Sequence, residues 1–189
     1  LYDWANDSYV NEIVVWTLVE SQGEAEAIAD LLLSENSSGA RRTSLSGAIG
    51  EGVKRLEAVP FSADRLVIDI SGDGPNNMGL PVVPVRDDLI EQGITINGLP
   101  IVLKSVSNFS LFNIPNLDVY YEDCVIGGPG AFMITVDDPQ RFAAAIRRKL
   151  VLEIAGLQPK VIKVAETFRP APRVDCMIGE KTRRRWMDP

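Results

Sequence analysis

The 189-residue sequence contains no histidine. This absence excludes histidine-based acid–base catalysis, Ser-His-Asp and Cys-His nucleophiles, and every metal site that needs an imidazole ligand. The sequence also has no apolar run near the roughly 18 to 20 residues of a transmembrane helix, so membrane insertion is not expected. Any chemistry must therefore come from hydroxyl groups, carboxylates, amides or the backbone.

Apolar residues make up 46% of the chain and charged residues 24%, which is typical of one globular domain with a full core. Asp and Glu outnumber Lys and Arg by 26 to 19, and the net charge of −7 argues against non-specific binding to nucleic acid. The charge is uneven, because residues 156–189 hold eight basic and four acidic side chains together with four prolines. We therefore expect a domain over residues 1–155 and a basic, proline-rich C-terminal extension over 156–189 that packs on it.

Apolar strand patterns alternate with amphipathic helix patterns through the first 155 residues. The expected strands are 1–4, 12–19, 65–71, 94–99 and 131–136. The expected helices are 24–33, 45–56, 82–92, 117–125 and 139–155. This alternation predicts an α/β fold with a doubly wound, mostly parallel sheet flanked by helices. The run 65–71 (RLVIDIS) is nearly all apolar, which indicates a central strand covered on both faces.

A candidate site follows from this arrangement, because ligands of such folds bind beyond the carboxyl ends of the strands. The loop 72–77 (GDGPNN) follows the expected central strand, and Thr43 stands just before a helix that should begin beside it. The Thr43 hydroxyl and the Asp73 carboxylate are hard oxygen ligands suited to Mg²⁺, Ca²⁺ or Mn²⁺. Four neighbours are candidate supporting or partner-contacting residues: Ser44, Ser71, Asn76 and Asn77. The alternative is that Thr43 is only a helix N-cap and Asp73 only a turn residue.

Four stretches carry a resemblance to a known family: TSLSGAI (43–49), VIDISGDG (67–74), ITINGLP (94–100) and CVIGGPGAF (124–132). They resemble a bacterial, functionally uncharacterised branch of the von Willebrand factor A superfamily, over most of residues 1–155. The resemblance implies a Rossmann-like sheet with a metal-ion-dependent adhesion site, in which Thr43 matches the metal-binding threonine and Asp73 the metal-associated aspartate.

One element of that family pattern has no match in this sequence, the Asp-x-Ser-x-Ser loop that follows the first strand. The chain begins at Leu1 with no initiator methionine or signal segment, so we expect that it begins inside the domain. The first strand, the first helix and the Asp-x-Ser-x-Ser loop would then lie upstream of Leu1. The cation site would be half present in these 189 residues.

Two classes of function remain open. The first is a non-catalytic module that binds an unknown protein partner through a divalent cation, as an adhesion or scaffold domain. The second is a metal-dependent hydrolase that uses Asp73 with Asn76 and Asn77. The sequence favours the binding module, because it places no second carboxylate or nucleophile near Asp73. A structural domain whose metal site has decayed is a further alternative. The loop 104–114 carries Phe109 and Phe112, which are candidate partner contacts.

The two cysteines, Cys124 and Cys176, lie in the domain and in the extension. They are either two buried thiols or one disulfide that closes about 50 residues. A disulfide would explain how the extension stays docked, and it would indicate a periplasmic or extracellular protein.

Overall fold

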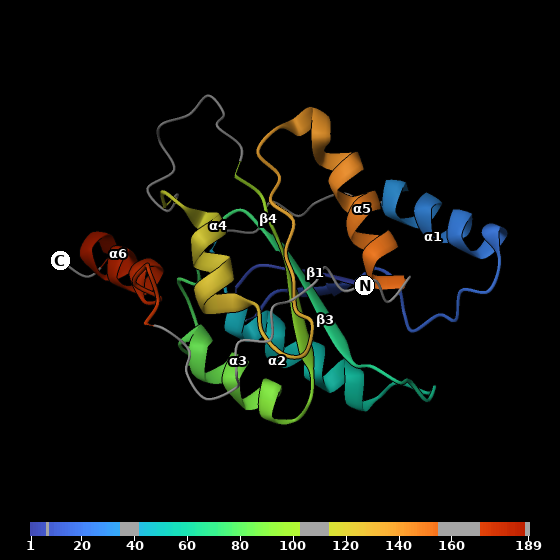
Figure 1. Ribbon diagram of the computed structural model, residues 1–189, viewed down its shortest axis with the longest axis horizontal. Coiled ribbons are helices and arrows are strands. Elements are labelled where there is room, and N and C mark those ends of the chain that lie inside the picture. Colours follow the sequence, from blue (N-terminus) through green and yellow to red (C-terminus); the bar gives the residue numbers. More distant parts are fainter. Residues whose placement is uncertain (7, 35–41, 103–113, 155–170, 188–189) are drawn as a thin grey trace.

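The computed structural model describes residues 1–6, 8–34, 42–102, 114–154 and 171–187 (Figure 1). The strands are β1 (Tyr2–Trp4), β2 (Val10–Glu12), β3 (Val67–Gly72) and β4 (Thr95–Pro100). The helices are α1 (Gln22–Ser34), α2 (Leu45–Glu57), α3 (Val82–Glu91), α4 (Leu117–Tyr120), the π-helix η1 (Tyr121–Val125), the 3₁₀-helix η2 (Pro139–Arg141), α5 (Phe142–Ile154) and α6 (Ile178–Met187). The fold is therefore mixed α/β, as the alternating pattern predicts. The loop 104–114 falls almost entirely outside the described residues.

The main sheet consists of β3 and β4, which pair in parallel from Val67–Thr95 to Gly72–Pro100. On its other edge β4 forms isolated parallel bridges to the segment 131–136, between Gly98 and Met133 and between Ile101 and Val136. All six residues of β4 are buried. The sequence predicts a strand over residues 131–136. The structure shows only these isolated bridges there, so that prediction is wrong.

The prediction that residues 65–71 form the strand covered on both faces is wrong. In β3 burial alternates: Ile68 and Ile70 are buried, the Asp69 side chain is 38% exposed beneath Lys149, and Ser71 is exposed. All six residues of β4 are buried, so the strand covered on both faces is β4. Within the described residues β3 pairs only with β4 and is therefore an edge strand of this sheet. A run of apolar residues in the sequence does not distinguish a strand covered on one face from a strand covered on both faces.

Helices lie on both faces of this sheet (Figure 1). Helix α2 lies on the face of Ile68, whose Cδ1 is 3.0 Å from the position a Cβ at Gly52 would take. Helix α5 lies on the opposite face, where Lys149 forms an ion pair with Asp69. The core on the α2 side includes Leu45, Ile49, Leu56, Tyr120 and Tyr121.

The prediction of a strand over residues 12–19 is wrong beyond Glu12. Strand β2 pairs with β1 in an antiparallel hairpin, and this pairing ends where the Ile13 and Val14 amides both donate to the Leu1 carbonyl. The chain then turns toward α2, and the Trp16 indole donates to the Arg55 carbonyl over 2.8 Å. Val15, Trp16, Leu18 and Val19 are exposed, while Ile13 and Val14 are half-buried. The apolar residues after Val14 therefore have no strand partner among the described residues.

The C-terminal segment 171–187 contacts the domain at several points. Cys176 forms a disulfide with Cys124 of η1. The Arg173 guanidinium donates to the Asp123 carboxylate over 2.7 Å and to Glu122 over 2.6 Å. Glu180 of α6 accepts a hydrogen bond of 2.7 Å from the Asn76 side chain. The described part of the extension is thus linked to the loop that follows β3.

Candidate functional site

The two loops that the sequence places together do meet at the carboxyl end of β3. The Thr43 amide donates to the Asn77 side-chain oxygen over 3.0 Å, and the Asn77 amide donates to the Thr43 carbonyl over 2.9 Å. These reciprocal hydrogen bonds fix the start of α2 against the loop that contains Asp73. The two loops therefore form one rigid edge of the site.

Asn76 and Asn77 are buried and use their side chains internally. The Asn76 oxygen accepts from the Ser46 amide over 3.2 Å, while its side-chain nitrogen donates to the Leu80 carbonyl over 3.0 Å and to Glu180. Asn76 is fully buried and Asn77 is 3% exposed. Their side chains are buried and hydrogen-bonded within the protein, where they shape the loop.

Ser44 is the N-cap of α2, and its hydroxyl accepts from the Gly47 amide over 3.2 Å. The alternative that Thr43 is the N-cap is therefore wrong. Thr43 stands one residue earlier and lines a cavity beside the sheet. A Cβ at Gly74 would lie 3.4 Å from the Thr43 hydroxyl oxygen, so that oxygen lies close to the chain that follows Asp73.

This cavity has a volume of about 470 Å³. Thr43, Ser71 and Asp73 line it at the strand end, and Asp3 of β1 and Asp69 of β3 line it as well. Sequence reasoning missed the last two, because the position of the β1–β2 hairpin relative to β3 is set by tertiary packing. The structure thus brings two more carboxylates to the cavity that contains Asp73.

Those two carboxylates already have partners. Asp69 forms an ion pair with Lys149 of α5, and burial raises the pKa of Asp69 to about 6 against the opposing effect of the Lys149 charge. Lys149 also contacts Glu153 over 2.7 Å, and Glu153 accepts a 2.8 Å hydrogen bond from Asn97 of β4. The Tyr9 hydroxyl donates to Asp3 over 3.4 Å.

A buried tyrosine lies beneath the strand end. Tyr121 is fully buried, and among the described residues its hydroxyl has no hydrogen-bond partner. Burial raises the pKa of Tyr121 above its usual value, with smaller contributions from Tyr120 and Asp73. The hydroxyl oxygen would lie 2.6 Å from a Cβ at Gly72, so a glycine is required there by close approach.

The donor set fits part of a hard-cation shell. Hydroxyls from Thr43 and Ser71 and the carboxylate of Asp73 are oxygen donors of the kind that Mg²⁺ or Ca²⁺ prefers. Within the described residues, however, no cluster of three or more Asp, Glu, Cys or His side chains is placed to hold a metal ion. A complete cation site would therefore need ligands from elsewhere.

These features define a mixed α/β domain with a cavity at the carboxyl end of a parallel strand, whose wall includes hydroxyl and carboxylate groups. Residues 1–158 match the model of a protein family described as a protein of unknown function, DUF1194, and the chain belongs to that family. No curated protein and no solved structure matches the chain. No helix among the described residues is long and apolar enough to cross a membrane.

Proposed function

We propose that this protein is a von Willebrand A-type module that binds a protein partner through a divalent cation and performs no catalysis. The observation that carries the proposal is the pair of hydrogen bonds between Thr43 and Asn77, which holds the Thr43 loop against the Asp73 loop. Thr43 and Asp73 are the residues that the family resemblance assigns to cation binding. Rigid placement of two oxygen ligands is what a cation site of this kind needs.

In this proposal Thr43 and Asp73 hold part of the shell of an Mg²⁺, Ca²⁺ or Mn²⁺ ion, supported by Ser71. When bound, the cation would accept a carboxylate of the partner as a further ligand. The side chains of Ser44, Asn76 and Asn77 position the two loops without reaching the ion. The remaining ligands are water and the Asp-x-Ser-x-Ser loop of the family pattern, which residues 1–189 do not contain.

A hydrolase receives less support from the same cavity. A general base near Asp73 would have to be Asp3 or Asp69, the other carboxylates of the cavity wall. Asp69 is paired with Lys149, and Asp3 accepts from Tyr9. Hydrogen bonds from Lys149 and Tyr9 already engage these two carboxylates, so neither is dedicated to orienting a water molecule. The oxygen groups of Thr43, Ser71 and Asp73 therefore fit a binding role better than a catalytic one.

The Cys124–Cys176 disulfide supports a proposal about location. Structural disulfides persist in oxidising compartments and are rare in the cytosol. We propose that the protein acts in the periplasm or outside the cell.

Calorimetry with MgCl₂, CaCl₂ and MnCl₂ tests the proposed cation site. We expect residues 1–189 alone to bind these ions weakly or not at all, and the protein extended to its natural upstream sequence to bind measurably. The Asp73→Asn variant of the extended protein should lose that binding. Asp88→Asn, at an exposed carboxylate on α3, is the matched control and should retain it. Equal binding by Asp73→Asn and the parent would overturn the assignment.

A further inference from the structure

The C-terminal segment 171–187 is held against the domain beside the loop that follows β3. It lies beyond residues 1–158, which match the family model. Its anchor is the disulfide between Cys176 and Cys124 of η1, and Cys124 is fully buried. Val174, Cys176 and Ile178 of the segment pack against the hydrophobic core. The segment is therefore part of the folded domain, and its place beside the loop is fixed.

Helix α6 meets this loop at a glycine. A Cβ at Gly179 would lie 2.0 Å from the Asn76 carbonyl oxygen and 3.1 Å from the Pro75 side chain, so only a glycine allows this close approach. Asp175 fixes the start of the helix, because its carboxylate accepts a hydrogen bond from the Met177 amide over 3.0 Å. The first turn of α6 therefore packs directly on the backbone of the loop.

Glu180, the next residue of α6, binds the side chain that organises the loop. Its Oε1 accepts a hydrogen bond from the Asn76 side-chain nitrogen over 2.7 Å. Its Oε2 is buried and has no hydrogen-bond partner among the described residues, and burial raises the pKa of Glu180. The contact with Asn76 therefore needs one acceptor oxygen at this position and no charge.

A buried tyrosine provides a second connection between the loop and the segment. The Tyr120 hydroxyl accepts from the Asn76 amide over 3.1 Å and donates to the Cys176 carbonyl over 3.5 Å. Burial raises the pKa of Tyr120 above its usual value, so the hydroxyl keeps the proton that it donates. Arg183 donates to the Asn77 carbonyl over 3.4 Å. Hydrogen bonds thus join the segment to both asparagines of the loop.

These two asparagines hold the candidate site together. Asn76 accepts from the Ser46 amide in the first turn of α2, and Asn77 exchanges two hydrogen bonds with Thr43. A shift of either asparagine would therefore move Thr43 relative to Asp73. None of the residues 171–187 lines the 470 Å³ cavity, so the segment acts on the site through the asparagines.

We propose that residues 171–187 form a strap that holds Thr43 and Asp73 in their relative positions, with Glu180 as its positioning residue and the Cys124–Cys176 disulfide as its anchor. Glu180 acts through Asn76, a contact that spans 104 residues of sequence. The strap makes the cation affinity of the site depend on the C-terminal segment. This consequence for cation binding rests on the proposed function, whereas the holding of the two loops does not.

Backbone amide exchange of residues 1–189 in EDTA tests the strap without any cation. The loop amides are those of Thr43, Ser46 and Asn77, whose hydrogen bonds join the two loops. The sheet amides are those of Thr95 and Ile101, which bond to the chain at the two ends of β3 and report the integrity of the main sheet.

Two variants release the strap in different ways. Glu180→Ala removes the acceptor of the Asn76 side chain, and Gly179→Ala places a methyl group against the Asn76 carbonyl. Both variants should speed exchange of the loop amides about tenfold or more and leave the sheet amides unchanged. Glu180→Gln keeps an acceptor oxygen at this position, so its loop amides should exchange within about twofold of the parent.

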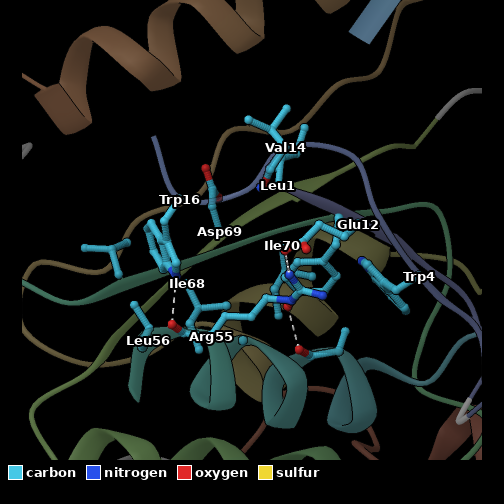
Figure 2. Close-up of a pocket in the computed structure, with 14 residues that line it drawn as sticks. Leu1, Trp4, Glu12, Val14, Trp16, Arg55, Leu56, Ile68, Asp69 and Ile70 are labelled. Carbon is cyan, nitrogen blue, oxygen red and sulfur yellow. Dashed lines mark hydrogen bonds and ion pairs between the residues drawn. The ribbon is translucent and has the colours of Figure 1, made fainter. Parts of the chain in front are cut away.

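A hydrogen bond near the other end of α2 supplies the matched control. The Trp16 indole donates to the Arg55 carbonyl over 2.8 Å (Figure 2), roughly 14 Å along the helix from Ser46. Trp16→Phe removes that hydrogen bond and should leave the loop amides as in the parent. Arg185→Ala, at an exposed position of α6, should leave them unchanged as well.

Calorimetry with MgCl₂ on the extended protein of the cation test measures the consequence for the site. Glu180→Ala should weaken binding about tenfold, and Glu180→Gln should bind as the parent does. A parent protein that binds no cation contradicts the proposed function, and the exchange experiment alone then decides the strap. The two failures are therefore distinguishable.

Each of the following results overturns the strap. Loop amides that exchange as in the parent in both Glu180→Ala and Gly179→Ala show that the segment does not hold the loops. Equal acceleration of the loop and sheet amides shows that the segment supports the whole fold and not the site. An unchanged affinity of Glu180→Ala, in a protein whose parent binds the cation, shows that the site does not depend on the segment.

Discussion

Lys149 of α5 lies against Asp69 of β3 and is only 3% exposed. A buried ammonium group needs compensating charge, and Asp69 together with Glu153 supplies it. Because Asn97 also bonds to Glu153, this cluster fixes α5 across both strands of the main sheet. The cluster is thus a buried polar contact between α5 and the main sheet.

The pH dependence of Asp69 is the first prediction. Burial raises the pKa of Asp69 in the folded protein to about 6, above its unfolded value, so the folded state binds the proton more tightly. The stability contributed by this proton is present at about pH 4 and is lost as the pH rises through about 6. Asp69→Asn, which is neutral at every pH, should remove that loss.

Urea unfolding of the parent and Asp69→Asn at pH 4 and pH 7 measures the effect. The free energy of unfolding of the variant minus that of the parent should become more positive from pH 4 to pH 7. If the difference becomes more negative, the attraction of Lys149 for the charged carboxylate outweighs desolvation.

Asn76→Ala should destabilise the protein by about 1 to 3 kcal/mol or more, because it leaves the buried Ser46 amide and the Leu80 carbonyl without a partner. Denaturant unfolding measures the loss. Asn11→Ala, at an exposed position of β2, is the control and should change stability by less than about 0.5 kcal/mol. A loss at Asn76 as small as that at Asn11 would show that the loop does not depend on this amide.

Gly72→Ala should destabilise the protein by about 1 to 3 kcal/mol, because the added methyl group meets the Tyr121 hydroxyl at 2.6 Å. Tyr121→Phe removes that oxygen and should reduce the cost of Gly72→Ala. A double-mutant cycle by thermal unfolding measures the coupling. Additive effects of the two substitutions would contradict the close approach.

Reduction of the Cys124–Cys176 disulfide should lower stability by roughly 4 kcal/mol on the chain-entropy account, since the bond closes a loop of about 50 residues. Melting temperatures with and without a reductant measure the change. The double variant Cys124→Ala, Cys176→Ala is the control and should melt at the same temperature in both conditions. An unchanged melting temperature of the parent on reduction would contradict this account.

The sequence predicts elements whose signal is local. Apolar spacing predicts α2 and α3 closely, and Asp138 caps the start of η2 through the Gln140 amide, as an Asp-Pro pair indicates. The sequence also predicts that the Thr43 and Asp73 loops meet. In an α/β fold the loops at the carboxyl ends of the parallel strands lie together at one end of the sheet.

The sequence does not predict features that depend on tertiary neighbours, such as which side of a helix faces the sheet. The stripe of α5 at Phe142, Ile146, Leu150 and Ile154 predicts a core-facing side. Ile146 is half-buried, but the other three residues are exposed, and Lys149 is the buried residue that faces the sheet. Periodicity identifies an apolar side of a helix, but the pairing with Asp69 determines which side turns inward. The same limit applies to Asp3, which reaches the cavity only through the packing of the hairpin.

The most direct test of the central claim, that Thr43 and Asp73 form one cation site, is paramagnetic line broadening by substoichiometric Mn²⁺ in the protein with its natural upstream sequence. We predict that the amide signals of Thr43–Ser46 and Ser71–Gly74 broaden first, ahead of that of the exposed acidic residue Asp88 of α3. Broadening that begins at α3, or is uniform over the acidic surface, would contradict the assignment of the site.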